Sequence, residues 1–147
     1  METDRRRQLV RELVALRQIT SQEELVDLLR QEGVVATQPT VSRDLEVLGI
    51  TKVRGANGRL FYTVPNHAGL VQVLRQFATG IDASGNLAVV RTPPGVAAAV
   101  AAAIDAGVVP GVLATVQGDD TVLVVAVEGI SGREVADRLT AIKQDRP

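Results

Sequence analysis

The sequence contains no cysteine, one histidine and very few aromatic residues among its 147 positions. Without cysteine, disulfide bonds and thiolate metal sites are excluded, and the composition suits a cytosolic protein. The single histidine, His67, argues against a histidine-based metal or acid–base site. Because aromatic residues make up only 2% of the chain, the core must be built from Val, Leu, Ile and Ala.

A long hydrophobic run is also lacking. The most apolar stretch, Val96 to Ile104, is far too short to cross a membrane. The basic residues Arg5 to Arg7 are followed by no apolar run, so the N-terminus does not read as a signal peptide. We therefore expect a cytoplasmic protein with no membrane partner.

A strong excess of positive charge is missing as well. The net charge is −1 and the pI is near 5.8, whereas nucleic-acid binders are usually basic. Residues 1–65 hold 10 Lys/Arg against 9 Asp/Glu, and residues 66–147 hold 6 against 8, so the balances are +1 and −2. Between Gln76 and Gly132 the only basic residue is Arg91. The second half is therefore locally acidic and differs in character from the first.

Residues 1–65 follow the pattern of three helices and a β-hairpin. Apolar residues at helical spacing predict one helix over 4–17, a second between the Thr20/Ser21 caps and Gly33, and a third from the Thr37 cap to Leu48. Two short strands, 50–53 and 60–64, flank an Ala-Asn-Gly turn, which is a strong hairpin signal. This order predicts a winged helix-turn-helix domain.

The third helix and the hairpin carry the side chains that suit DNA. An α-helix fits the major groove, where Arg pairs with guanine and Gln with adenine, and Ser or Thr can bind phosphates or bases. The alternative is a small protein–protein domain with solvated polar faces. With a balance of only +1, one copy should bind DNA weakly, so several copies would have to act together. The candidate DNA-binding residues are Gln38, Thr40, Ser42, Arg43, Lys52, Arg54 and Arg59.

The second half alternates helices and strand pairs. We expect a linker at 66–70 and then helix, two strands, helix, two strands, helix, which is an α+β domain with an antiparallel or mixed sheet. The overall prediction is an α+β protein: a DNA-binding domain at 1–65 and, at 71–147, an α/β-sandwich-like domain for oligomerisation and ligand binding. The predicted elements are helix 70–78, strands 81–83 and 87–91, a helix from the Pro93-Pro94-Gly95 turn to 105, strands 112–117 and 121–127, and a helix from the Ser131 cap to 143.

The predicted helix at 96–104 is apolar on every side. Such a helix must be buried all round, which is difficult inside one domain of this size. We therefore expect an oligomer interface here. The alternative is an ordinary core helix with one thin exposed alanine stripe.

The turn Gly118-Asp119-Asp120-Thr121 places two carboxylates side by side at a strand end. Adjacent carboxylates repel each other unless a cation or donor groups lie nearby. A solvated hairpin turn is one interpretation, since Gly and Asp favour turns. Catalysis or a Mg²⁺ site would need partner residues that the sequence does not offer. A pocket for a cationic small molecule fits better, because carboxylates pair well with guanidinium.

These features together resemble the bacterial arginine repressor family over essentially the whole chain. The resemblance rests on TSQEELVDLL at 20–29, QPTVSRDL at 38–45, TPPG at 92–95 and TVQGDDTVL at 115–123. It implies a repressor of arginine biosynthesis genes that binds operators made of paired palindromic boxes. It also implies L-arginine as corepressor, with no other cofactor, bound where two trimers meet in a hexamer.

Carried over by position, Ser42 and Arg43 correspond to the DNA-reading pair, with Gln38 and Thr40 as neighbours. The resemblance assigns L-arginine binding to the second domain, with Gln117 contributing backbone. Which of the paired acids reaches the opposite trimer stays open. The ligand-binding residues so implied are Asp105, Thr115, Gln117, Asp119 and Asp120.

One position departs from the family pattern. Three residues after the glycine of the PPG turn the family usually has Gln, His or Asn, and this chain has Ala98. The departure bears on ligand affinity and, less strongly, on ligand identity. A regulator that senses a different cation and a ligand-independent interaction module are therefore kept as alternatives.

Overall fold

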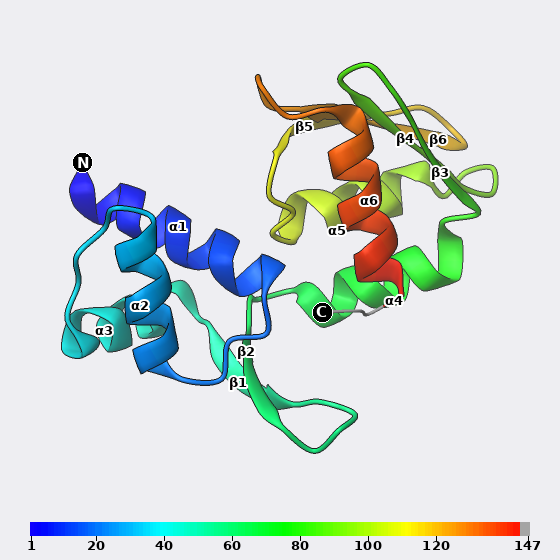
Figure 1. Ribbon diagram of the computed structural model, residues 1–147. Coiled ribbons are helices and arrows are strands. Elements are labelled where there is room, and N and C mark those ends of the chain that lie inside the picture. The colour runs from blue at the N-terminus through cyan, green and yellow to red at the C-terminus, as the bar shows by residue number, and fades with distance from the viewer. Residues whose placement is uncertain (145–147) are drawn as a thin grey trace. The chain divides into compact units, whose positions relative to one another are not determined.

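The computed structural model describes residues 1–144 and divides the chain into two compact units, residues 1–65 and residues 66 onward. The first unit consists of three helices followed by a two-stranded antiparallel hairpin (Figure 1). The three helices pack on a small aliphatic core that includes Leu25, Leu29, Val41 and Leu45. The predicted winged helix-turn-helix pattern is confirmed. Its elements are α1 (Glu2–Leu16), α2 (Gln22–Gln31), α3 (Gln38–Leu48), β1 (Thr51–Arg54) and β2 (Leu60–Thr63).

The ends of α2 and α3 follow the capping signals in the sequence. The Ser21 hydroxyl accepts a hydrogen bond from the Glu24 amide at 3.1 Å, and the Thr37 hydroxyl accepts one from the Thr40 amide at 3.4 Å. These side chains satisfy amides that have no partner inside the helix. Gly49 ends α3 with φ of +69°, in the left-handed region that glycine adopts without strain. The caps fix where α3 begins and ends, and so which side chains it exposes.

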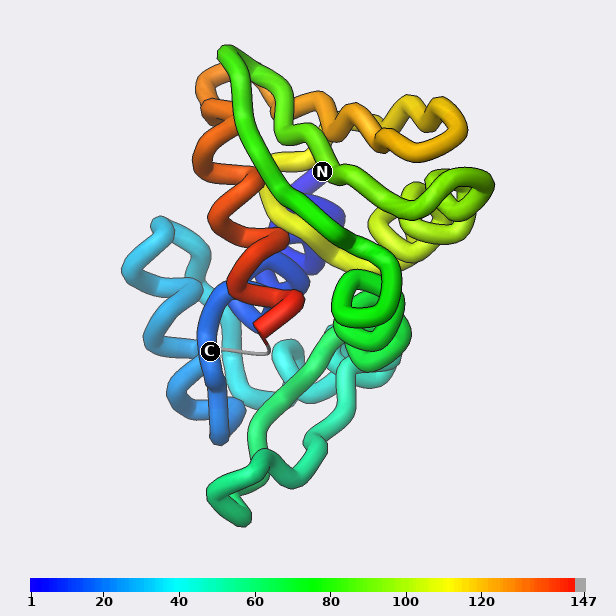
Figure 2. Tube along the Cα trace, turned by 90° about the vertical axis from the view of Figure 1, so that its right-hand side faces the viewer, coloured from blue at the N-terminus to red at the C-terminus, as the bar shows by residue number. Residues whose placement is uncertain are grey.

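The second unit is a four-stranded antiparallel sheet with its three helices on one face (Figure 1, Figure 2). The strand order is β3-β4-β6-β5. Side chains alternate along the strands, so Val90, Val122 and Val124 face the helices and are fully buried. The predicted α+β class is confirmed. The elements are α4 (His67–Phe77), β3 (Gly80–Ser84), β4 (Leu87–Arg91), α5 (Ala97–Ala106), β5 (Val112–Gln117), β6 (Thr121–Ala126) and α6 (Gly132–Lys143).

The predicted linker at 66–70 is largely helical. Helix α4 begins at His67, three residues before the expected start, so most of this segment forms its first turn. Asn66 adopts a left-handed conformation, and its side-chain amide donates to the Ala106 carbonyl at 3.2 Å. Asparagine and glycine favour loops, which is why the sequence predicts a linker here. Here the turn needs only Asn66, because asparagine tolerates positive φ.

Helix α5 has an exposed face within the single chain. Ala97, Val100 and Ile104 are buried, whereas Ala98 and Ala102 are exposed, together with Ala99. The single chain therefore leaves one face of α5 uncovered, and both the expected oligomer interface and the alternative of a core helix with an exposed alanine stripe stay predictions. Helical periodicity explains this, because only about half of a helix can face one sheet. Across residues 1–144, no helix combines the length and apolar character needed to cross a membrane.

Candidate nucleic-acid interface and ligand site

Helix α3 presents its candidate DNA-binding side chains to different degrees. Gln38 and Arg43 are exposed, while Thr40 and Ser42 are half-buried. The Thr40 hydroxyl lies 3.0 Å from the Thr37 hydroxyl, so it takes part in the cap of the helix. The freely presented groups are therefore the guanidinium of Arg43 and the amide of Gln38, the two side-chain types that read guanine and adenine.

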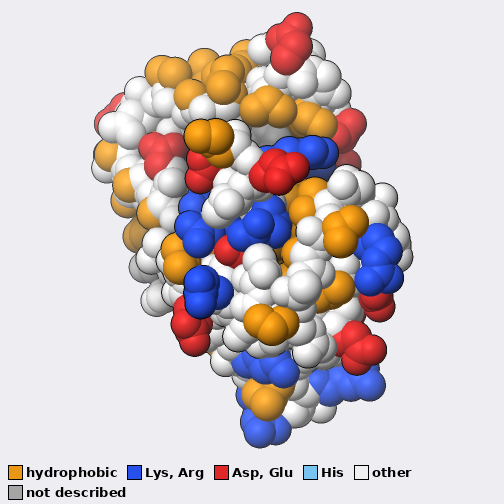
Figure 3. Space-filling view, turned by 90° about the vertical axis from the view of Figure 1, so that its left-hand side faces the viewer, with side chains coloured by type: hydrophobic (Ala, Val, Ile, Leu, Met, Phe, Trp, Pro, Cys, Tyr) orange, Lys and Arg blue, Asp and Glu red, His pale blue; other side chains and the backbone are white. Residues whose placement is uncertain are grey.

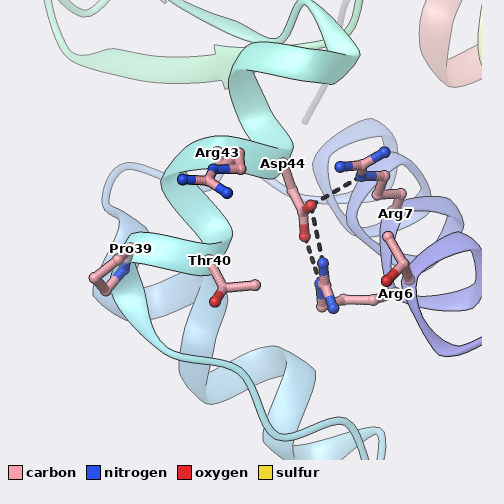
Figure 4. A pocket seen from close by; sticks show the side chains of 7 residues that line it. Arg6, Arg7, Pro39, Thr40, Arg43 and Asp44 are labelled. Atoms are coloured by element: carbon pink, nitrogen blue, oxygen red, sulfur yellow. Dashed lines mark hydrogen bonds and ion pairs between the residues drawn. The ribbon is translucent and has the colours of Figure 1, made fainter.

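A buried ion cluster joins α3 to α1. The Asp44 side chain, only 1% exposed, accepts hydrogen bonds from two arginines of α1. Arg6 donates through Nε at 2.5 Å and through a terminal nitrogen at 3.1 Å, and Arg7 donates through Nε at 2.9 Å. Figure 4 shows both arginines reaching from α1 toward the carboxylate. This contact sets the orientation of α1 relative to the helix that carries Arg43.

The two arginines keep Asp44 ionised. Burial alone raises the pKa of this carboxyl, because it disfavours the charged form. The hydrogen bonds from Arg6 and Arg7, and then their charges, outweigh burial and hold the pKa below its ordinary value of 3.8. In turn, the hydrogen bond to Asp44 raises the pKa of Arg6.

Sequence reasoning did not identify this cluster. Asp44 follows the buried Val41 by three positions and precedes the buried Leu45, so it lies on the core side of α3. A carboxylate at such a position requires a buried cationic partner. That requirement, read together with the basic run Arg5 to Arg7, was the available signal.

The hairpin holds its basic side chains in part through local contacts. Lys52 places its ammonium 5.1 Å from the centre of the Tyr62 ring, a cation–π geometry. Arg54 donates to the Gly58 carbonyl at 2.7 Å near the tip, and Arg59 is exposed. In the space-filling view, Lys and Arg side chains are interspersed with Asp and Glu rather than forming one continuous basic surface (Figure 3). On the face shown, which includes both units, this distribution agrees with the small charge balances of the two halves of the chain.

In the second unit, the paired-acid turn is tied to the turn that precedes α5. The Asp119 carbonyl accepts hydrogen bonds from the amides of Gly95 and Ala97 at 3.1 and 3.3 Å, and the Asp120 carbonyl accepts one from Thr92 at 2.8 Å. Gly95 has φ of +82°, which a glycine tolerates. Two sequence motifs, TPPG and GDDT, thus form one backbone-bonded unit.

The two carboxylates of this turn are exposed. One oxygen of Asp120 accepts from the Thr121 hydroxyl at 2.9 Å. Within residues 1–144, the Asp119 carboxylate has no hydrogen bond or ion pair. The backbone is held firmly while the charge of Asp119 is left unpaired, which suits a cation from outside the chain.

Of the other three predicted ligand residues, Gln117 directly precedes this turn, whereas Asp105 and Thr115 lie near the opposite end of α5. The Thr115 hydroxyl donates to the Asp105 carboxylate at 2.8 Å, which joins β5 to the C-terminal end of α5. The Asp119 turn contacts the N-terminal end of the same helix, about 12 Å away at 1.5 Å of rise per residue. Gln117 is exposed and pairs with Val122. One chain therefore brings the predicted residues together in two groups and does not join them in one pocket.

Both halves of the chain match known family models. Residues 1–70 match the model described as arginine repressor, DNA binding domain, and residues 74–141 match arginine repressor, C-terminal domain. A similar protein is the arginine repressor of Symbiobacterium thermophilum. It is 42% identical over 144 residues, which cover 94% of this chain and 96% of that protein.

Proposed function

Because this chain belongs to the arginine repressor family, whose members are DNA-binding regulators and not enzymes, we propose how its residues carry out arginine-responsive regulation. The chain controls transcription, with arginine biosynthesis genes as its targets. Helix α3 lies in the major groove, with Arg43 and Gln38 at base edges and Thr40 and Ser42 at its side. Lys52, Arg54 and Arg59 of the hairpin contact the adjacent backbone. The observation that carries this proposal is an exposed Arg43 on a helix whose orientation is fixed by a buried ion cluster.

The ligand is L-arginine, held by Asp119 and Asp120. A guanidinium forms paired hydrogen bonds with a carboxylate, and Asp119 offers an unpaired, exposed carboxylate on a backbone-bonded turn. In one chain, Asp105 and Thr115 form a separate pair near the opposite end of α5 from this turn. We infer that a second copy supplies these two residues, so that the ligand bridges subunits, and that Gln117, next to the turn, contributes its backbone.

An oligomer is supported by the uncovered surface of the second unit. The sheet face opposite the helices carries a row of Val89, Leu123 and Val116 across three neighbouring strands. Leu123 is 37% exposed and Val116 is 59% exposed, and Leu113 in the same strand reaches 67%. Exposed apolar side chains in a row, and separately the alanine stripe of α5 on the helical side, are features of surfaces that bind other subunits. We propose a trimer that pairs into a hexamer, acting in the cytoplasm, where the bacterial DNA lies.

Ligand binding and DNA binding are coupled through this assembly. A ligand that contacts two subunits stabilises the assembled state by mass action. The assembly brings several weakly binding first units to adjacent DNA boxes, where their affinities combine. Arginine therefore raises DNA affinity without touching DNA.

The DNA-reading part is tested with Arg43→Ala. A preferred duplex is first selected with the wild-type protein from a random-sequence library, and affinities are compared with a scrambled duplex. We expect Arg43→Ala to lose at least about tenfold in preference for the selected duplex, since a bidentate base contact contributes about 1–3 kcal/mol. Sedimentation should show an unchanged assembly. An unaltered preference would exclude Arg43 from base reading.

A further inference from the structure

The ion cluster at the α1–α3 contact contains more positive charge than its carboxylate can neutralise. Asp44 contributes one negative charge, and Arg6 and Arg7 contribute two positive charges. A third cation, Arg43, directly precedes Asp44 on α3. These residues surround a cavity of about 370 Å³ that is lined mainly by charged and hydroxyl-bearing side chains: Thr3, Arg6, Arg7, Pro39, Thr40, Arg43 and Asp44.

The two arginines of α1 are bound differently. Arg6 faces the carboxylate with two of its nitrogens, one to each oxygen, and its side chain is 17% exposed. Arg7 uses only Nε, and its side chain is 29% exposed. Within residues 1–144, the terminal nitrogens of Arg7 have no hydrogen bond. Arg6 and Asp44 thus form a neutral, bidentate pair, while Arg7 keeps a net charge and unused donors at the cavity.

We propose that this cavity binds a phosphate group of the DNA backbone, with Arg7 as the contacting residue and the Arg6–Asp44 pair as its positioning group. The inference rests on the proposed function and adds a contact from α1, outside the recognition helix and the hairpin. A guanidinium whose Nε is held by a carboxylate presents its two terminal nitrogens in a fixed plane, the geometry that suits phosphate oxygens.

Its position favours DNA over a free anion. The cavity lies beside the first half of α3, because Pro39, Thr40 and Arg43 form one of its walls. When a helix enters the major groove, the phosphates of the bordering strand run along its sides. Arg43 can then reach a base edge while Arg7 reaches the phosphate next to it. The threonine hydroxyls at the cavity are further possible donors to the phosphate oxygens.

The test compares Arg7→Gln with Arg11→Gln. Both variants remove one charge from α1, but Arg11 is exposed and does not line the cavity. Affinity for the selected and scrambled duplexes is measured over a salt series. We expect Arg7→Gln to weaken both duplexes by a similar factor of about ten, and to lower the slope of log affinity against log salt by about 0.9 for each bound copy. Arg11→Gln should change affinity less than about twofold.

Several results would overturn the inference. These are an unchanged salt slope in Arg7→Gln, an equal effect of Arg11→Gln, or a loss confined to the selected duplex. Phosphorus NMR with inorganic phosphate tests whether the cavity binds a free anion instead of a DNA phosphate. Phosphate binding that is lost in Arg7→Gln, while duplex affinity stays unchanged, would assign the cavity to a free anion instead.

A different set of results would contradict the proposed function itself. If the wild type prefers no duplex, base reading is absent, and the inference falls with it. If the wild type keeps a preference that Arg43→Ala removes while Arg7→Gln has no effect, only the inference falls. Should Arg7→Gln lower the melting temperature markedly, Arg7→Lys serves instead. We expect it to retain the wild-type salt slope, because the charge remains, and to lose affinity by a smaller factor.

Discussion

The two units use carboxylates in opposite ways. Asp44 in the first unit is almost fully buried and receives three hydrogen bonds from two arginines of its own chain. Asp119 in the second unit is exposed, and its side chain has no partner within residues 1–144 although its backbone is bonded twice. A carboxylate whose partners come from its own chain stabilises the fold. One that is held in place without a partner is available to a ligand.

The largest expected effect concerns the second unit. Asp119→Asn combined with Asp120→Asn should reduce L-arginine affinity by about three orders of magnitude, because each charged hydrogen bond contributes about 1.5–3 kcal/mol. Calorimetry would record the loss as vanishing heat at millimolar ligand. Glu128→Gln is the matched control, since it removes an exposed acid from the same unit and should leave the heat unchanged. Full heat in the double variant would place the ligand elsewhere.

In the first unit, neutralising the buried carboxylate should change the stability of the fold. Asp44→Asn leaves two arginines facing a neutral amide and should lower the free energy of unfolding by about 3 kcal/mol, the range found for broken buried ion pairs. Denaturant unfolding measures this. Asp27→Asn is the control, because its pair with Arg30 is exposed and should contribute less than about 1 kcal/mol. Equal effects of the two variants would show that the buried cluster contributes no more stability than an exposed ion pair.

The stability that Asp44 contributes to the first unit should also depend on pH. The pKa of Asp44 is lowered on folding, so its contribution to stability is complete above the ordinary value of 3.8 and is lost as pH falls toward the lower folded pKa. The difference in unfolding free energy between wild type and Asp44→Asn should therefore be constant near neutrality and shrink below about pH 4. Unfolding curves at several pH values check this. A difference that grows in acid would contradict the direction of the shift.

The smallest expected effect is at Ala98. This exposed residue of α5 stands at the position where the family resemblance predicts a polar side chain, and the TPPG turn before it is bonded to the Asp119 turn. Ala98→Gln should raise arginine affinity by up to about tenfold, through one added hydrogen bond to a charged group. Ala102→Gln, one turn further along the exposed stripe, is the control. An equal gain in both variants would mean that the added side chain acts on the assembly rather than on the ligand.

Local signals in the sequence predicted most of the fold. Ser21, Thr37 and Gly49 act within a few residues of their own positions, so the ends of α2 and α3 follow from pattern alone. The partners of Asp44 lie 37 and 38 positions away, and only tertiary packing brings them together. The exposed stripe of α5 likewise depends on which side of the helix meets the sheet. A sequence pattern therefore predicts a helix cap more readily than a contact between two helices.

The candidate sites divide along the same line. The candidate DNA-binding residues follow from helical phase and hairpin chemistry, which can be predicted from the sequence. The ligand residues were assigned by resemblance, and one chain separates them into the Asp105–Thr115 pair and the Asp119 turn. A second copy would be needed to bring these residues into one pocket, and a single sequence does not show how two copies pack.

In the proposed mechanism, an exposed carboxylate pair in the second unit controls DNA reading by the first. The most direct test is a titration of the selected duplex with and without L-arginine, using the wild type and Asp119→Asn with Asp120→Asn. We expect arginine to raise the DNA affinity of the wild type and to leave that of the double variant unchanged. An equal response of both proteins to arginine, or no response of the wild type, would contradict it.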